Sequence, residues 1–392
     1  MKSYTATASD GRAIDFVDRK RGLWLLSVLF PLQPFPGIFL HASTGNEAWL
    51  LLPFITSFVL MPLLDALIGE DRNNPPEAVV PRLNADPYYL RLLRLVVPLH
   101  FVALIGTAWW AGSQDLSIWA FVGLAAVAGM TSGLGINTGH ELGHKTSRTD
   151  RWLARIVLAV PAYGHFTIDH NRGHHSEVAT PEDPASARMG ESIYRFAGRE
   201  IPGAFRRAWR YEAERLQRKG LSPLSRHNEI LQSLALALLL QAFLVVWLGP
   251  SMIPFLVIHN LFAWWQLTSA NYVEHYGLLR RRQNNGRPEP CRPHHSWNSN
   301  HALSNLVLFH LQRHSDHHAH PARPFQSLRH FDDLPTLPSG YFGSYLLAWC
   351  PWLWFRVMDP KLIALPHVGG RLDRVNVDPR RRAYLEARFG RA

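Results

Sequence analysis

The residues best suited to chemistry in this chain are histidines, grouped at four sites. The sites are His140-Glu-Leu-Gly-His144, His170-Asn-Arg-Gly-His174-His175, Asn271-Tyr-Val-Glu-His275-Tyr-Gly277 and His314-Ser-Asp-His317-His318. Neutral imidazole binds iron, zinc, copper or nickel. Residues four apart, such as His140 and His144, share one face of a helix. One such pair is a weak signal among 21 histidines, but the sites together indicate a metal centre.

The number of histidines favours two metal ions. A catalytic zinc usually takes three protein ligands, fewer than the eight or nine imidazoles available here. Redox-active iron is the simplest interpretation, and copper and manganese remain open. His275 stands alone after an acidic residue, so its spacing by itself favours a structural role. The first site also matches the H-E-x-x-H zinc protease motif, with Glu141 as general base.

Carboxylates lie beside the predicted ligands. A metal-bound histidine usually donates its second ring N–H to a carboxylate or a carbonyl. The candidates for this role are Glu141, Asp169, Glu274 and Asp316, with Asp183 of Pro181-Glu-Asp-Pro184 as a further one.

The elements that must position these sites are apolar helices. No lysine or arginine occurs in 22–71, 95–144 or 227–279. One membrane span needs about 20 apolar residues, so each block fits two spans joined by a turn. We place them at about 22–41, 48–68, 95–112, 117–137, 230–249 and 252–271. The sequence therefore predicts an all-α membrane protein with six transmembrane helices.

The distribution of charge predicts the topology. Cationic arms and loops favour the cytosolic side, which puts both termini inside. The predicted segments are an arm (1–21), helices 1–4 (22–137), a cytosolic segment with the first two sites (138–229), helices 5–6 (230–271) and a cytosolic remainder with the other two (272–392). All four sites then fall on one face, in a histidine-rich helical cap.

Three polar or short segments are harder to assign. Residues 201–220 are arginine-rich with aromatic residues interleaved, which fits an amphipathic helix on the membrane surface or a solvated helix equally well. The apolar pieces Leu303–Leu311 and Tyr341–Phe355 are too short or interrupted to be clear spans. The polar N-terminus predicts no cleavable signal peptide.

Composition excludes several classes. Cys291 and Cys350 form no CxxC pair, so we expect no disulfide framework, iron–sulfur centre or fused rubredoxin domain. The formal charge of +11 lies in segments that flank apolar hairpins. Contact with membrane lipid and topology explain most of it, and nucleic acid is not an expected partner.

At these residues the chain closely resembles the AlkB-type alkane 1-monooxygenases, membrane-bound non-haem di-iron enzymes of the fatty-acid desaturase/hydroxylase superfamily. The resemblance runs from Leu23 to about Gly370. It rests on Asn137-Thr-Gly-His-Glu-Leu-Gly-His-Lys145, His170-Asn-Arg-Gly-His-His, Ala179-Thr-Pro-Glu-Asp-Pro184, Asn271-Tyr-Val-Glu-His-Tyr-Gly277 and Leu311-Gln-Arg-His-Ser-Asp-His-His318. The third of the four histidine sites separates this family from desaturases and sterol hydroxylases. One departure is Asp169, where glutamate is commoner.

The resemblance implies a six-helix fold with a cytosolic di-iron cap, in the bacterial cytoplasmic membrane. It implies no haem, flavin or iron–sulfur cluster in this chain. It makes His275 a ligand, against the interpretation from spacing. The implied iron ligands are His140, His144, His170, His174, His175, His275, His314, His317 and His318.

The implied activity is hydroxylation of the terminal methyl of medium-chain n-alkanes to primary alcohols with dioxygen. The implied electron donor is a separate rubredoxin, itself reduced by an NAD(P)H-dependent rubredoxin reductase. An alkane has no polar group, so we expect a narrow apolar channel between the spans to select the chain end. The residues we assign to this channel are Ser57, Phe58, Met61, Trp109, Trp265 and Leu267.

Other functions compete with this one. A zinc-dependent intramembrane protease built on His140, Glu141 and His144 leaves at least six histidines unexplained. A di-iron desaturase or a different hydroxylase is a closer rival, and a non-catalytic metal store is a third. Their products distinguish them: an alcohol, an alkene or a cleaved peptide, while a store consumes no dioxygen.

Overall fold

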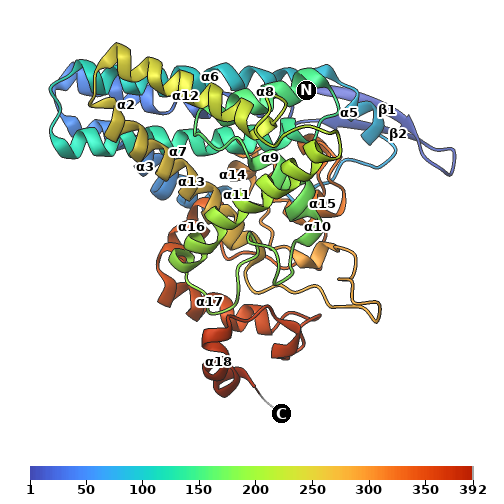
Figure 1. Ribbon diagram of the computed structural model, residues 1–392. Helices are drawn as coiled ribbons and strands as arrows, with labels where there is room; N and C mark the ends of the chain where they lie inside the picture. The colour runs from blue at the N-terminus through green and yellow to red at the C-terminus, as the bar shows by residue number, and fades with distance from the viewer. Residues whose placement is uncertain (391–392) are drawn as a thin grey trace.

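Long parallel and antiparallel helices form a bundle, and shorter helices gather beside one end of it (Figure 1). The computed structural model describes residues 1–390. Its elements are β1 (Lys2–Thr7), β2 (Ala13–Asp18), α1 (Leu25–Leu29), α2 (Pro34–Thr44), α3 (Leu52–Ile55), α4 (Met61–Ile68), α5 (Val80–Asn84), α6 (Pro87–Ser113), α7 (Ile118–Gly143), α8 (Arg148–Ala159), α9 (Phe166–Asp169), α10 (His175–Glu177), α11 (Ile193–Gln217), α12 (Glu229–Leu248), α13 (Met252–His275), α14 (Ala302–Val307), α15 (His314–Ala319), α16 (Tyr341–Trp349), α17 (Pro351–Ile363) and α18 (Arg382–Phe389).

Four helical segments are long and apolar enough to cross a membrane: Glu47–Ile68, Val80–Ser113, Ile118–Gly143 and Glu229–Leu248. The pair Leu25–Leu32 and Pro34–Thr44, bent by 41°, makes a fifth if it is one span. Prolines at the bend lack the backbone N–H that would continue the helix. These segments fit a membrane protein, and the six-span topology stays a prediction.

The sixth predicted span, 252–271, lies within the continuous helix α13. This helix is not among the segments that are apolar enough, because polar residues such as His259 and Gln266 interrupt its apolar sequence. Both side chains are buried within the protein. The helix α7 also runs beyond its predicted end at residue 137, so that His140 lies in its last turns.

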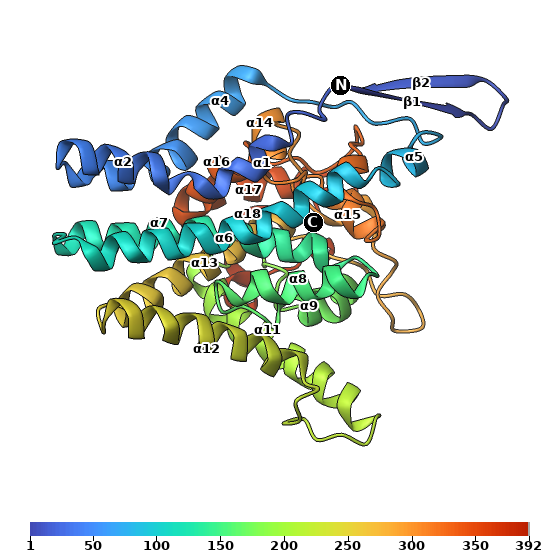
Figure 2. The same ribbon diagram turned by 90° about the horizontal axis from the view of Figure 1, so that it is seen from above.

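Glycines let α7 and α13 pack closely, in the middle of the bundle (Figure 2). A Cβ atom at Gly129 would overlap the backbone oxygen of His259, and one at Gly133 would lie 2.6 Å from the Cβ of Gln266. The contact therefore depends on the missing side chains. It fixes the relative positions of the two helix ends that carry His140 and His275.

The N-terminal arm corrects the all-α prediction. Residues 2–18 form an antiparallel hairpin in which Tyr4 pairs with Phe16, and it extends from one end of the bundle (Figure 1). Tyr4 and Ala6, on one face of β1, are buried, as expected for a strand with one face packed on the protein. The Tyr4 hydroxyl donates to Asp86 at 2.6 Å, and Arg21 pairs with the same carboxylate at 2.6 Å. This network ties the hairpin to the first turn of α6.

The three segments that were hard to assign from the sequence have definite structures. Residues 201–220 begin inside α11 and continue to its end at Gln217. This stretch packs Arg207 and Glu212 into the protein, so its polar face is not simply solvated. The piece 303–311 forms most of α14 and a turn in which Phe309 and His310 adopt positive φ values of 51° and 53°. The piece 341–355 is divided between α16 and α17.

The substitution Gly129→Ala tests the close packing of α7 and α13. We expect it to lower the free energy of unfolding by about 1–3 kcal/mol, because the backbone of α13 must move to admit the methyl group. Thermal unfolding in detergent measures the change. The control is Gly198→Ala in α11, where a Cβ meets nothing within 4 Å and helix propensity favours alanine. Equal stability of the two variants would contradict the packing argument.

Candidate metal centre

The structure gathers all nine predicted histidines into two adjacent groups. The ligand atoms within each group lie within 4.8 Å of one another. The first group is His140, His144, His170, His175 and His317, and the second is His174, His275, His314 and His318. His275, which spacing alone assigned to a structural role, lies in the second group.

Four separate stretches of chain supply these rings. They are the end of α7, the segment 166–177, the end of α13 and α15. The segment 166–177 contains a π-helical turn, His170–His174, between α9 and α10. Such turns inside α-helices often mark functional sites. Here the segment contributes to both groups, because His174 joins one group and its neighbour His175 joins the other.

The spacing of the ring nitrogens fits ligands around a metal ion. The Nε2 atoms of His140 and His317 are 2.9 Å apart, and those of His317 and His175 are 3.1 Å apart. In the second group the Nε2 atoms of His314 lie 2.9 Å from His318 and 3.2 Å from His275. Two imidazoles bound at right angles with metal–nitrogen bonds of about 2.1 Å have nitrogens roughly 3 Å apart.

The chemistry of the donors agrees with this spacing. Burial lowers the pKa of His314, His317 and His318 well below the ordinary value, so these rings stay neutral and can bind a cation. The Nε2 atoms of His144 and His174 are buried and have no hydrogen-bond partner among residues 1–390. A buried polar atom without a partner is costly. Metal coordination would remove that cost.

Asp183 and Arg207 orient His174. The Nδ1 atom of His174 lies 2.9 Å from the Oδ2 atom of Asp183, which also accepts a hydrogen bond from the Ser186 hydroxyl. Arg207 donates to the other carboxylate oxygen, Oδ1. Burial raises the pKa of Asp183, but the facing His174 and Arg207 outweigh it and hold the pKa well below the usual range. Arg207 also binds both oxygens of Asp169, at 2.6 and 2.9 Å. Local sequence gives no signal for Arg207, because it approaches from α11, a separate helix.

Glu274 is, after Asp183, the predicted carboxylate that lies nearest a cluster nitrogen. One of its oxygens is 3.4 Å from the Nε2 atom of His314, and the other accepts a hydrogen bond of 2.8 Å from the Tyr341 hydroxyl. The sequence did not single out Tyr341. Its hydrogen bond fixes the carboxylate at the edge of the second group.

The other predicted carboxylates lie farther from the rings that they were expected to orient. Glu141 is 4.0 Å from the Nδ1 atom of its neighbour His140 and 3.8 Å from Lys145. Asp169 pairs with Arg207. Asp316 pairs with Arg329 at 2.7 Å and contacts His320. The structure therefore brings Glu274 and Asp183 to cluster histidines most directly.

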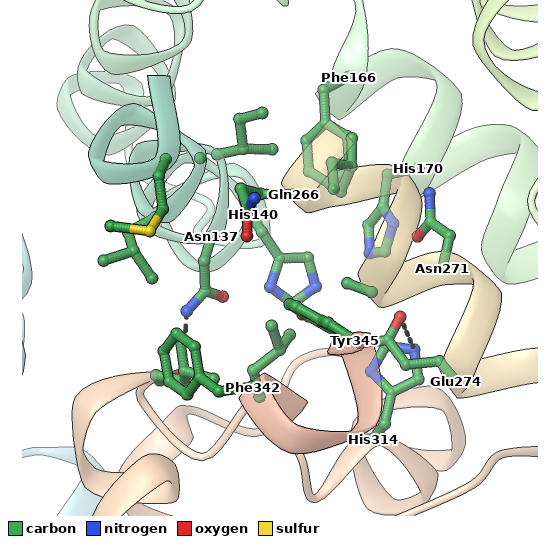
Figure 3. A pocket seen from close by; sticks show the side chains of 18 of the residues that line it. Asn137, His140, Phe166, His170, Gln266, Asn271, Glu274, His314, Phe342 and Tyr345 are labelled. Atoms are coloured by element: carbon green, nitrogen blue, oxygen red, sulfur yellow. Dashed lines mark hydrogen bonds and ion pairs between the residues drawn. The ribbon is translucent and has the colours of Figure 1, made fainter. Parts of the chain in front are cut away.

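An apolar cavity ends at the histidines (Figure 3). Its walls come mainly from α7, α13 and α16, and include Phe342 and Tyr345. His140, His170, His314 and Glu274 lie at its polar end. The cavity holds about 60 Å³, room for only about four to six water-sized groups. It suits the end of an alkyl chain.

Most residues assigned to the channel lie away from this cavity. Leu267 lines it. Phe58 is one layer behind, with its ring 6.2 Å from that of Phe342, and Met61 is in the same buried core. Ser57 is buried and donates to Gln33, and Trp265 stacks on Tyr194. Trp109 is 46% exposed on the outside of the bundle. The route by which a substrate enters stays a prediction.

Glu200, on α11, is a buried carboxyl group that the sequence did not single out. It accepts hydrogen bonds from Thr268 at 2.8 Å and Asn271 at 3.1 Å. It lines a second hollow, of about 10 Å³, which also touches His170 and His174. Burial raises the pKa of Glu200 from 4.5 to about 7.

Comparison with known proteins shows the family to which the chain belongs. The sequence profile of the fatty acid desaturase family matches residues 116–345. Alkane 1-monooxygenase 1 of Alcanivorax borkumensis is 54% identical over 383 residues, which cover 97% of this chain and 94% of that protein. Alkane 1-monooxygenase of Ectopseudomonas oleovorans is 55% identical over 380 residues, covering 96% and 94%. The hydroxylase component of a xylene/toluene monooxygenase from Pseudomonas putida is 29% identical over 340 residues, covering 85% and 88%.

Replacing Asp183 tests its role in orienting His174. We expect Asp183→Asn to weaken metal binding by about 10–100-fold, the usual effect of losing a carboxylate that holds a ligating histidine. Metal retained per chain against a graded chelator measures the affinity. The control is the neighbouring Glu182→Gln, whose carboxylate is largely exposed. Unchanged retention in Asp183→Asn, with unchanged helix content by circular dichroism, would refute this role.

The raised pKa of Glu200 predicts a pH dependence of stability in metal-free protein. From pH 4.5 to about 7 the unfolded chain releases a proton that the folded protein keeps, so stability falls as pH rises. The full loss is roughly 3 kcal/mol, at about 1.4 kcal/mol per pH unit. Unfolding at pH 5 and pH 8 should show Glu200→Gln more stable than the parent only at pH 8.

The matched control for this experiment is Glu214→Gln, an exposed carboxyl group on the same helix. We expect its stability to follow that of the parent protein at both pH values. Glutamine at 200 keeps an acceptor for Asn271 and offers a donor to the Thr268 hydroxyl, so the contacts persist. Parallel pH curves for Glu200→Gln and the parent would contradict the raised pKa.

Proposed function

Because the chain belongs to the AlkB-type alkane 1-monooxygenases of the fatty acid desaturase family, we propose that it oxidises medium-chain n-alkanes at the terminal methyl group. One atom of dioxygen enters a terminal C–H bond to give the primary alcohol. The other leaves as water, with two electrons and two protons consumed. The membership makes the chain an oxidoreductase; the substrate range and the electron donor are parts of the proposal.

The observation that carries the proposal is the apolar cavity that ends at His140, His170 and His314 (Figure 3). A substrate without polar groups can be held only by shape and by burial, at about 0.8 kcal/mol per methylene. A cavity of about 60 Å³ admits a chain end more readily than the middle of a chain. Terminal selectivity follows from that geometry.

The two histidine groups would each hold one iron ion, with five rings for the first and four for the second. Iron, when bound, supplies the redox chemistry that activates dioxygen. The protein holds the rings neutral and oriented, and its apolar walls exclude water from the reacting carbon. Glu274, held by Tyr341 at the cavity end, is placed to accept or release a proton at its carboxylate oxygen.

Electrons would come from a separate rubredoxin, reduced by an NAD(P)H-dependent reductase. The chain has two free cysteines, Cys291 and Cys350, too few for a rubredoxin-type iron site of its own. Its formal charge of +11 favours an acidic partner. We also propose that the histidine groups and both termini lie on the cytosolic side of the bacterial inner membrane, as the charge distribution predicts.

A reconstituted assay tests the proposed function. The protein in nanodiscs receives rubredoxin, its reductase, NAD(P)H, dioxygen and octane, and metal content is measured on the same sample. We expect about two irons per chain and 1-octanol that forms only when rubredoxin is present. An alkene as product would indicate a desaturase, and one zinc with peptide cleavage a protease.

Substitutions link the activity to the clusters. We expect His318→Ala to abolish 1-octanol formation and to lower bound iron, because it removes a ligand of the second group. The control is His294→Ala, which removes a histidine outside both groups. Full activity of His318→Ala would overturn the assignment of that ring. Iron without octanol in the parent protein would restrict the proposal to other alkanes.

A further inference from the structure

The helices α8, α11 and α12 lie together on one side of the bundle (Figure 2). Their side chains line a cationic hollow. We call it the basic hollow and define it by Arg148, Arg151, Trp152, Arg155, Arg215 and Lys219. Its volume is about 320 Å³. A second hollow of about 290 Å³ adjoins it across Arg151 and Arg155 and adds Lys145 and Arg172. Neither hollow is part of the histidine clusters or the apolar cavity.

The positive charge of the basic hollow is only partly neutralised by the protein. Glu229 pairs with Arg155 at 2.8 Å. The buried Glu212 binds Arg215 at 2.6 Å and also accepts from the backbone N–H of Glu229. No carboxylate among residues 1–390 lies within ion-pair distance of the remaining cations, Arg148, Arg151 and Lys219. The hollow therefore presents three cations without an ion-pair partner in the described chain, beside Arg155 and Arg215, which ion pairs hold in place.

The basic hollow lies next to the apolar outer surface of the bundle. Glu229, in its wall, is the first residue of α12. Beyond it the outward face of α12 is apolar, with Leu238 59% and Leu239 69% exposed. The guanidinium of Arg155 lies over the ring of Trp152, with its central carbon 4.8 Å from the ring centroid. Tryptophan is typical of the boundary between lipid tails and headgroups.

We propose that the basic hollow binds the phosphodiester headgroup of an anionic phospholipid, whose acyl chains lie along the exposed face of α12. Arginine forks match the geometry of phosphate oxygens, and basic pockets beside membrane helices commonly hold anionic headgroups. The apolar surface next to the cations distinguishes a lipid from a free anion. It also favours a lipid over an acidic protein, which would not use the flank of a spanning helix.

The test compares the stability of purified protein in phosphatidylcholine nanodiscs with and without phosphatidylglycerol. We expect phosphatidylglycerol to raise the thermal unfolding temperature of the parent protein. In the double variant Arg148→Gln/Arg151→Gln the affinity for phosphatidylglycerol, measured by titration in detergent, should fall roughly 30-fold. Each basic residue at an anionic surface contributes a factor of roughly five.

The matched control is Arg287→Gln/Arg380→Gln, which removes the same charge at two exposed arginines outside the hollow. It should keep the affinity of the parent for phosphatidylglycerol. Equal unfolding temperatures of all three proteins in pure phosphatidylcholine would show that both double variants fold. An equal loss in both variants would mean that net charge alone attracts the lipid, and would overturn the proposal.

Two further measurements distinguish the lipid from a free anion and from the protein partner. Inorganic phosphate should leave the unfolding temperature unchanged, and a shift as large as that given by the lipid would make this a site for a free anion. Turnover at limiting rubredoxin should match between the two double variants. A rubredoxin-dependent loss confined to Arg148→Gln/Arg151→Gln, with lipid affinity unchanged, would assign the hollow to the protein partner instead.

Discussion

The crowding of nine imidazole rings, seven of them from buried residues, is the constraint on which the rest of this structure depends. A ring nitrogen removed from water without a partner costs about 1–3 kcal/mol, and the buried Nε2 atoms of His144 and His174, one in each group, have no partner among residues 1–390. Charging the rings would be worse, since like charges would face one another at close range. Metal binding would resolve both problems, so we expect the stability of this region and its metal affinity to be coupled.

The bundle makes this crowding feasible by fixing the relative positions of two of the four contributing segments. Gly129 and Gly133 let α7 and α13 approach closely, which places His140 and His275 near each other at the same end. The remaining rings come from 166–177 and α15, held by buried polar networks. Arg207 is the centre of one network, since it joins Asp169, Glu177 and Asp183.

The site keeps an apolar environment and a polar environment apart. Apolar walls from the helices lead to a polar end formed by neutral rings and Glu274. A hydrophobic chain gains free energy by entering, and the fixed dipoles at the end need no reorganisation by water. A membrane supplies the same gradient from outside, because apolar substrates accumulate in its core. Anchoring to charged lipid headgroups would hold the cavity at a constant depth.

The sequence by itself determined most of the long helices and the histidine donors, but not the N-terminal hairpin. Blocks without lysine or arginine located the long helices, and the four histidine sites contain all nine rings. The resemblance supplied the prediction that His275 is a ligand. Only tertiary structure decided how the rings divide. His174 and His175 are neighbours yet join different groups. Successive residues of a helix point about 100° apart, so the two rings face different partners: His175 lies with the rings of α7, and His174 lies with His275 of α13. Arg207 and the basic hollow were equally hidden, since their partners come together only when distant helices pack.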